Sequence, residues 1–419
     1  MELETLYHNV ETDNYVETDN YPSLRWIVAS GYLYQLRALN DIAALIKEGD
    51  GEAVRQELFN LYSNNLNKAI GQVFKPDSNI PKHRDYYYKI QANTIKFSAY
   101  KAEYFKNALE NAYSKNPDSY NANAKNILQI GNRYQATEYN TAVARCRTAR
   151  QFSNFEQNSD ILPNLEWLRT RSASPRELHL AYVGLILPID DPFWQQNQPG
   201  NLYNCKCDWR QTNKPATKSP KKTVKPAKGL DGNPAKTREL YTDEHPYFAK
   251  ANEDAIPELD RFVSDQIFDT QFDKTNEGYY VHPLLDTKAS DYNDLTLIAG
   301  EFAKQGKEVY IMPNVTSESA LYNYLFRING VYKNKRPDFL INGNFYDFKS
   351  YEGKWKQSKL GNMLTKGRGQ VDRIIIDLRK YNVSTRYIKD NIIKRVSFGQ
   401  DIKEVWGLMP GETRELIYP

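Results

Sequence analysis

The sequence predicts a multidomain protein with a helix-rich N-terminal α(+β) domain, a basic linker and a C-terminal α/β domain. Three observations predict this organisation. The 419 residues are too many for one ordinary hydrophobic core. Apolar residues recur at three- and four-residue spacing through the first part of the chain, as they do in amphipathic helices. Beyond a lysine- and proline-rich segment, helical and strand patterns alternate, which is typical of helices packed on a mixed sheet.

The composition excludes several classes of protein. Hydrophobic residues make up 40% and charged residues 26% of the chain, as in a soluble protein. No run approaches 18 apolar residues, and the first residues lack the positive charge of a signal peptide, so we expect no membrane span and no Sec export. The three cysteines are too few for a disulfide framework, which fits a reducing compartment.

An N-terminal extension, residues 1–23, contains the sequence VETDNY twice in tandem, at 10–15 and 16–21. This repeat is too short to stack as a solenoid, so we interpret it as a surface expansion and assign it no function. A domain over residues 24–211 follows. Long helices are expected at 90–113 and 122–152, where glycine and proline are rare. Prolines then divide the rest of this domain into short strands and turns.

The linker, residues 212–238, contains the sequence KPATKSPKKTVKPAKGLDGNPAK. It has almost no apolar residues and therefore cannot bury enough surface to order itself. We predict an extended tether, with an arm that binds nucleic acid as the alternative. A helical connector is expected over residues 239–285, with one helix near 258–272.

The last domain, residues 286–419, is predicted to be a small α/β sandwich with a mixed sheet. Between Val331 and Pro419 there are 18 Lys and Arg against 10 Asp and Glu, as contact with a phosphate backbone would require. The expected elements are a helix at 292–306 closed by Gly306, a strand at 308–312, a hairpin at 337–349, a strand at 373–378, a helix at 385–394 and a strand at 404–409.

The hairpin carries the candidate chemistry. Asn342-Gly343 is a strong signal for a two-residue turn, and this turn sets Asp338 opposite Asp347 with Lys349 on the same face. Two carboxylates about 5 Å apart repel each other unless a cation lies between them. Oxygen ligands favour Mg²⁺, with Mn²⁺ or Zn²⁺ as alternatives. An acidic residue and a lysine on an exposed strand are usually only solvated, but the opposed acids favour a metal site.

These residue types predict phosphodiester hydrolysis. Asp338 and Asp347 would hold the metal ion and a water molecule, and Lys349 would orient that water and stabilise the transition state. A second group of residues would hold the substrate phosphate, namely Lys366, Arg368 and Gln370.

The hairpin matches the PD-(D/E)xK nuclease signature. The segments AGEFAKQGKEVYIMP, RPDFLINGNFYDFKS and GQVDRIIIDLR resemble the C-terminal tRNA nuclease domain of contact-dependent inhibition toxins over residues 286–419. The resemblance implies a restriction-endonuclease-like fold, tRNA as substrate and an immunity protein as partner. It also implies that Glu301 completes the metal site and that Gln370 points toward it. Glu301 is alternatively an ordinary helical glutamate beside Lys304, and other RNA or DNA remain candidate substrates.

Residues 166–211 resemble the phage Mu F-like minor head (head morphogenesis) proteins. The matching positions are Arg176, His179, Gly184, Asp190, Asp191, Asn204, Cys205 and Cys207. Residues 133–149 resemble the Thr-Glu-x-x-x-Ala helix of that family. One departure is that the aspartate which often precedes Arg-Thr-Arg is missing before Arg169. The resemblance implies a structural role at the portal or the inner capsid wall.

A zinc site is a second candidate. His179, Cys205 and Cys207 offer three soft ligands, and Asp190 or Asp191 could be the fourth. The alternative is that the thiols pack beneath the loop of Trp209 while His179 bonds a backbone carbonyl.

The leading hypothesis is a phage or prophage minor capsid protein with a C-terminal metal-dependent nuclease effector. It would reside in the virion and act in the cytoplasm of a producing or recipient bacterium. Its partners would be nucleic acid, portal and capsid proteins, and an immunity protein. The alternatives are a purely structural head protein with an inactive nuclease-like tail, and a stand-alone DNA repair enzyme.

Overall fold

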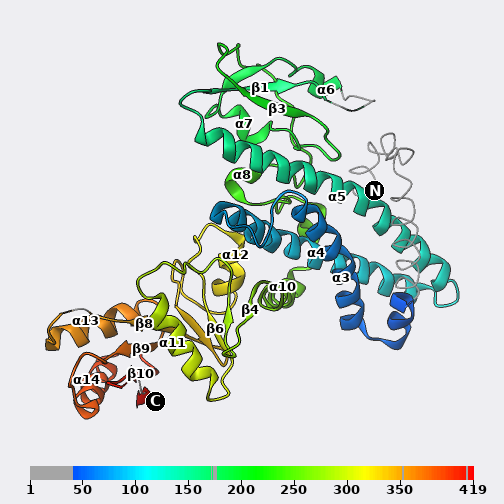
Figure 1. Ribbon diagram of the computed structural model, residues 1–419. Coiled ribbons are helices and arrows are strands. Elements are labelled where there is room, and N and C mark those ends of the chain that lie inside the picture. The colour runs from blue at the N-terminus through cyan, green and yellow to red at the C-terminus, as the bar shows by residue number, and fades with distance from the viewer. Residues whose placement is uncertain (1–40, 171, 173–176, 352, 412–413) are drawn as a thin grey trace. The chain divides into compact units, whose positions relative to one another are not determined.

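A computed structural model describes residues 41–419 except 171, 173–176, 352 and 412–413 (Figure 1). The VETDNY repeat and Arg176 lie outside these residues. The chain divides into two compact units, Met1–Val263 and Ser264–Pro419. The first is rich in helices, and the second contains a mixed eight-stranded sheet, so the prediction of a multidomain chain is confirmed.

Three long helices form the body of the N-terminal unit: α3 (Gly51–Gly71), α4 (Pro81–Lys115) and α5 (Tyr120–Gln157). Each contacts the other two. Proline at the first position of α4 suits a helix start, because that N–H has no partner within the helix. The two helices predicted at 90–113 and 122–152 are therefore confirmed, and both extend beyond the predicted ends.

A buried ion pair joins α4 to α5. The ammonium of Lys101 lies 2.5 Å from Oε2 of Glu138, and both side chains are almost fully buried. The ammonium also donates to the carbonyl of Gly131 and lies over the ring of Tyr62. Burial lowers the pKa of Lys101, and the charge of Glu138 opposes this effect. Buried charges are costly unless paired, so this pair restricts how α4 and α5 pack.

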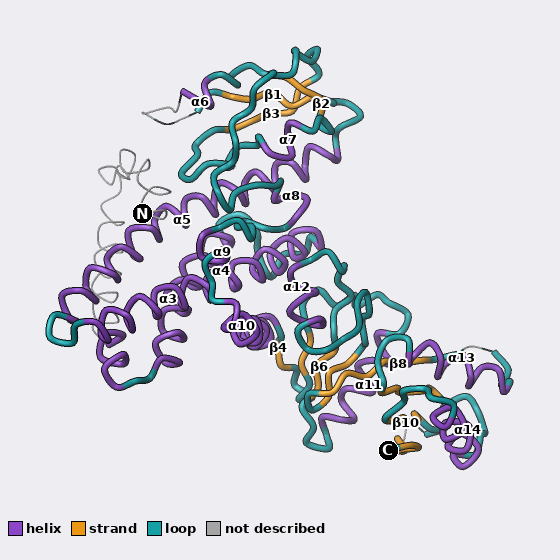
Figure 2. Tube along the Cα trace, turned by 180° about the vertical axis from the view of Figure 1, so that it is seen from behind, coloured by secondary structure: helices purple, strands orange, loops and turns teal. Residues whose placement is uncertain are grey.

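After α5, the N-terminal unit holds a small antiparallel sheet in the order β2-β1-β3. Its strands are β1 (Asn164–Leu168), β2 (Ile186–Pro188) and β3 (Asp208–Thr212), and the short helices α6 (Glu177–Leu180) and α7 (Phe193–Gln196) lie between them in sequence. Trp167, Trp194 and Trp209 form its buried aromatic core. Figure 2 shows this sheet and the larger C-terminal one as the two places where strands gather.

The predicted linker is largely ordered, which corrects the expectation of a tether. Arg145 of α5 donates to the carbonyls of Leu230, Asp231, Gly232 and Glu239. Tyr86 of α4 donates to the carbonyl of Ala235 in the short helix α8 (Pro234–Thr237). The composition of the segment did not predict this order, because the contacts are made by backbone carbonyls, which every residue carries. The whole segment belongs to the N-terminal unit, and Thr217 in its first half also bonds the carbonyl of Ile186.

The predicted connector is divided between the two units. Residues up to Val263 belong to the first unit, including α9 (Pro246–Ala249) and the 3₁₀ turn η3 (Glu253–Ala255). The boundary falls within the helix α10 (Ile256–Gln271). The C-terminal sheet begins soon afterwards with β4 (Asp273–Lys274) and β5 (Tyr280–Val281), which are too short to leave a periodic pattern in the sequence. The last domain therefore starts before residue 286.

The eight strands of the C-terminal unit lie in the order β11-β10-β9-β8-β7-β6-β5-β4. Pairing is parallel between β5 and β6, β8 and β9, and β9 and β10, and antiparallel elsewhere. The remaining strands are β6 (Val309–Ile311), β7 (Phe339–Ile341), β8 (Asn344–Lys349), β9 (Arg373–Asp377), β10 (Glu404–Leu408) and β11 (Arg414–Tyr418). The prediction of a mixed sheet is confirmed.

Helices cover both faces of this sheet. The helix α11 (Tyr292–Ala303) packs in one apolar cluster, which contains Ile375 of β9. The helices α13 (Gln357–Arg368) and α14 (Thr385–Ser397) pack in another, which contains Ile374 and Ile376. Alternate residues of a strand face opposite sides, so the two clusters lie on opposite faces. Between β6 and β7 lie α12 (Ala320–Tyr322) and a π-helical turn, η4 (Asn323–Arg327).

The helix α13 is absent from the predicted elements because glycines are unfavourable inside a helix and its sequence contains two of them. Gly367 lies so close to β9 that an added Cβ would approach Ile374 to 2.8 Å. The absence of a side chain at this glycine therefore allows α13 to pack closely against β9. Among the described residues, no helix is long and apolar enough to cross a membrane.

Candidate active site in the C-terminal hairpin

The hairpin between β7 and β8 has the predicted register. Phe339 pairs with Tyr346, Leu340 with Phe345 and Ile341 with Asn344, and continuing this ladder by one position sets Asp338 opposite Asp347. The turn residues Asn342 and Gly343 have φ values of 45° and 75°, as a type I′ turn requires.

Three side chains meet at the start of this ladder. Oδ2 of Asp338 accepts a hydrogen bond of 2.6 Å from the backbone N–H of Phe348. Lys349 forms an ion pair with Asp347 and also donates to the carbonyl of Phe348. Asp347 is 1% exposed, and its Oδ2 atom is the one that the ammonium of Lys349 contacts. The structure therefore brings Asp338, Asp347 and Lys349 together as predicted.

The two carboxyl groups are held in a state that resists ionisation. Burial raises the pKa of Asp338 to about 6. Burial, together with the charge of Asp338, raises the pKa of Asp347 to about 7, although Lys349 opposes the shift. A positive ion placed between the two groups would reverse this effect, because it favours both charged forms.

A third carboxylate, which sequence reasoning missed, acts on the same site. Asp291 immediately precedes the first turn of α11, and its charge also raises the pKa of Asp338. Glu301 follows ten residues later, about 15 Å along the helix. There it pairs with Lys304 at 2.7 Å and with Arg414 at 3.4 Å. Glu301 thus belongs to a different charge cluster. The sequence signal that could have identified Asp291 is its position at the start of the predicted helix.

An arginine fixes the start of α11. Arg379 contacts Asp294 at 2.6 Å and Asp377, the last residue of β9, at 2.9 Å. Since Asp294 lies one turn beyond Asp291, this network holds the helix end that carries Asp291. The pair with Asp377 also explains how that carboxylate tolerates burial.

Gln370 holds the backbone segment that precedes Asp338. Its Oε1 atom accepts a hydrogen bond of 3.1 Å from the backbone N–H of Arg336, two residues before Asp338. The structure thus gives Gln370 a positioning contact. Lys366 and Arg368 lie in the last turn of α13, just before Gln370, and the side chain of Lys366 is exposed. The described contacts place neither against the carboxylates.

Two segments of the chain match known families. Residues 104–210 match the model of the Phage Mu protein F like protein family, and residues 335–408 match that of the contact-dependent growth inhibition CdiA C-terminal domain. Capsid assembly protein F of Escherichia phage Mu is 28% identical over 85 residues, which are 20% of this chain and 19% of that protein. The chain thus spans about a fifth of this relative. No solved structure matches. The two resemblances inferred from sequence are confirmed.

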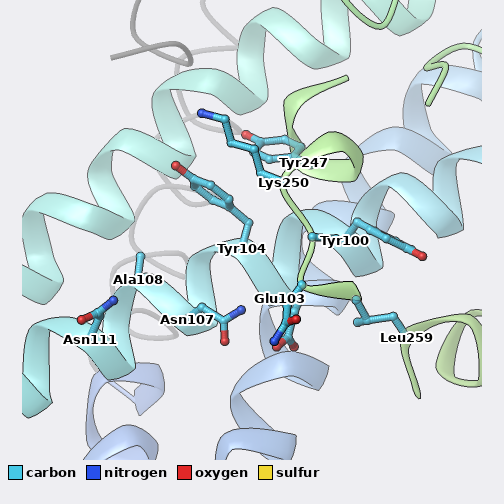
Figure 3. Close-up of a pocket in the computed structure, with 11 residues that line it drawn as sticks. Tyr100, Glu103, Tyr104, Asn107, Ala108, Asn111, Tyr247, Lys250 and Leu259 are labelled. Carbon is cyan, nitrogen blue, oxygen red and sulfur yellow. The ribbon is translucent and has the colours of Figure 1, made fainter. Parts of the chain in front are cut away.

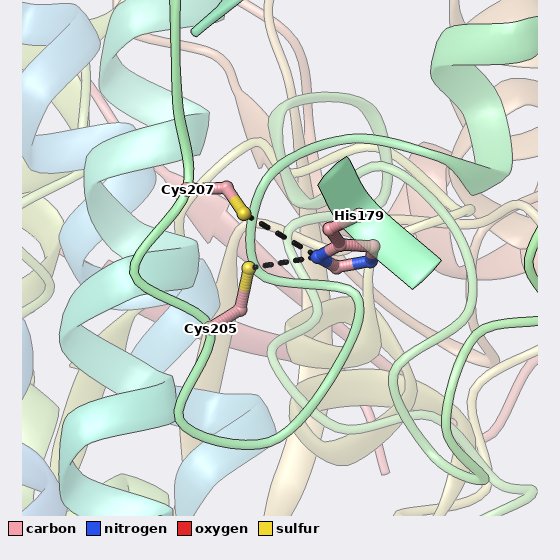
Figure 4. Close-up of side chains that lie close together, drawn as sticks. All are labelled: His179, Cys205 and Cys207. Atoms are coloured by element: carbon pink, nitrogen blue, oxygen red, sulfur yellow. Dashed lines mark hydrogen bonds between the residues drawn. The ribbon is translucent and has the colours of Figure 1, made fainter. Parts of the chain in front are cut away.

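The two matches cover different candidate sites. The C-terminal match includes Asp338, Asp347, Lys349 and Gln370 but begins after Asp291 and Glu301. The N-terminal match includes Glu138 of the buried ion pair and a cluster of His179, Cys205 and Cys207 (Figure 4). Neither Asp190 nor Asp191 contributes to this cluster as the described residues define it. Asp191 instead accepts a hydrogen bond from the N–H of Phe193.

The N-terminal unit also contains a pocket of about 270 Å³ (Figure 3). Tyrosines and amide side chains from α4 line one wall, and residues around α9 line the other. The pocket contains none of the residues predicted from sequence to carry chemistry. Its lining includes Tyr100, Glu103, Tyr104, Asn107, Tyr247 and Lys250.

Proposed function

We propose that this chain is a phage or prophage minor capsid protein whose C-terminal unit is a metal-dependent nuclease effector. The observation that carries the nuclease half is the opposed pair Asp338 and Asp347 with Lys349 beside it. The matches to the Mu F-like family and to the CdiA C-terminal domain support the two halves separately.

The residues of the site fit a hard divalent cation. Asp338 and Asp347 offer oxygen ligands, and Asp291 supplies a third negative charge. Such donor sets favour Mg²⁺, and Mn²⁺ is the usual substitute. When bound, the metal would supply an activated water and charge neutralisation at the phosphate.

The protein groups have separate roles around that chemistry. Asp338 and Asp347 hold the cation, and Lys349 places a positive charge beside the attacked phosphate. Gln370 fixes the backbone that leads into Asp338. Lys366 and Arg368, at the end of α13, contribute to binding of the nucleic acid backbone.

The proposed substrate is RNA, with tRNA first, because the C-terminal unit resembles a domain with that activity. A site of two carboxylates and a metal does not itself distinguish RNA from DNA, so DNA is the second candidate. The N-terminal unit would join the portal or capsid wall of the virion and would carry the nuclease with it. An immunity protein would then protect the producing cell.

The proposal is tested by incubating purified full-length protein with tRNA and with plasmid DNA, each with Mg²⁺, Mn²⁺ or Zn²⁺. We expect cleavage that EDTA abolishes and that Lys349→Ala reduces at least about 100-fold. Lys304→Ala is the matched control, because Lys304 is an exposed lysine outside the site. Folded protein that cleaves neither substrate with any of the metals would support the structural alternative.

A further inference from the structure

The cluster of His179, Cys205 and Cys207 in the N-terminal unit plays no part in the proposed nuclease. Nδ1 of His179 lies 3.6 Å from Sγ of Cys205 and 3.4 Å from Sγ of Cys207 (Figure 4). All three atoms lie within 4.8 Å of one another. The three groups therefore surround one small volume.

We infer that this cluster binds Zn²⁺ through Nδ1 of His179 and the two cysteine sulfur atoms. The distances fit this ion. With zinc–nitrogen bonds of about 2.0 to 2.1 Å and zinc–sulfur bonds of about 2.3 Å, a tetrahedral site separates nitrogen from sulfur by about 3.6 Å. The two distances in the structure agree with this separation.

Hydrogen bonding alone satisfies this arrangement poorly. One ring nitrogen either donates one proton or accepts one, so Nδ1 of His179 can bond only one of the two sulfur atoms well. Nor does the ring bond a backbone carbonyl, since Nε2 is buried and has no partner among the described residues. A cation held by Nδ1 satisfies all three groups at once and fixes the ring proton on Nε2.

The surroundings hold the ligands in place. His179 is 3% exposed, and its ring lies edge-on to Trp167. The loop that carries the cysteines is attached to α5, because Thr148 donates to the carbonyl of Pro199 and the N–H of Asn204 donates to Thr141. Asn204 has a φ of 55°, which turns the chain just before Cys205.

The fourth position is assigned to a water molecule. The described residues supply three ligands, and Cys207 is partly exposed, so solvent reaches the site on that side. The role of the ion is to join α6 to the loop of residues 197–207, two segments far apart in sequence. In a reducing compartment zinc can supply this link where a disulfide would not persist.

The test uses full-length protein carrying Asp338→Asn and Asp347→Asn, so that the proposed nuclease site neither binds metal nor harms the host. We expect about one zinc per chain by elemental analysis. Adding Cys205→Ser and Cys207→Ser should remove it. Cys146→Ala, which changes the third cysteine, should not. Cobalt added to the metal-free protein should give thiolate-to-cobalt absorption that the double serine variant lacks.

Two results would overturn the inference. One is protein with reduced thiols that binds neither zinc nor cobalt, with a circular dichroism spectrum showing the fold intact. The other is a native disulfide between Cys205 and Cys207, seen as a loss of two mass units. Neither result bears on the nuclease, whose residues lie in the other unit.

Discussion

The side chain of Gln370 accepts a hydrogen bond from the backbone of Arg336 and so links the end of α13 to the segment that enters β7. Asp338 follows two residues later, with Pro337 between them. The position of Asp338, the carboxylate proposed to bind metal, therefore depends on a side chain more than thirty residues away in the chain.

Replacing Gln370 with alanine should slow cleavage without unfolding the protein. Loss of the bond frees the segment before Asp338, and misplacement of a reacting group by about 1 Å can cost 100-fold in rate. We expect a drop in kcat of about 10- to 100-fold with KM changed less. Gln305→Ala changes an exposed glutamine of the same unit and serves as the control. Equal rates for the two variants would show that Gln370 has no positioning role.

The metal-free C-terminal unit should be more stable at pH 5 than at pH 8. Burial raises the pKa of Asp338 to about 6 and that of Asp347 to about 7, against about 3.9 in an unfolded chain. Their contribution to stability is fully present below about pH 4 and is lost as pH rises through 6 and 7. Calorimetry should show a lower melting temperature at pH 8, restored by Mg²⁺. Asp347→Asn should weaken the dependence on pH and on metal. An unchanged profile in that variant would contradict the assignment.

Asp291 and Glu301 should differ in their effect on metal binding. Asp291→Asn removes a charge that acts on Asp338, so we expect the Kd for Mn²⁺ to rise about tenfold in titration calorimetry. Glu301→Gln should leave the Kd within about twofold, because Glu301 pairs with Lys304 and Arg414 instead. A tenfold change in Kd corresponds to about 1.4 kcal/mol, and the change expected for Glu301→Gln is smaller than this. The opposite order would restore Glu301 as the third acid.

Breaking the buried pair of Lys101 and Glu138 should destabilise the N-terminal unit strongly. Lys101→Met removes the positive charge that balances the buried carboxylate of Glu138, and breaking a buried ion pair in this way typically costs about 3 to 5 kcal/mol. Removing both charges with Lys101→Met and Glu138→Leu should recover much of this loss. Lys106→Met is the control on the same helix, since its pairs with Glu103 and Glu110 lie nearer the surface. Helix unfolding in urea, followed by circular dichroism, measures each change. A double variant as unstable as the single one would contradict the explanation.

The sequence predicted those parts of the fold and site that depend on local pattern. Asn342 and Gly343 set the hairpin register, and from this register the meeting of Asp338, Asp347 and Lys349 followed directly. Residues whose position depends on packing between segments far apart in sequence were harder to predict. The charge of Asp291, at the start of α11, acts on Asp338, whereas Glu301 near the end of the same helix pairs with Lys304 and Arg414. The helix α13 was hidden because Gly367 makes room for Ile374.

The lysine- and proline-rich segment has a consequence for release of the C-terminal unit. Thr217, before the Lys-Pro run, bonds Ile186, and beyond the run the carbonyls from Leu230 onward are held by Arg145. A protease that cuts between these points would cleave the chain without releasing the C-terminal unit, because both new ends stay bound to the N-terminal unit. Release of the C-terminal unit would require a cut beyond α9, because Tyr247 and Phe248 of that helix pack against Phe97 of α4.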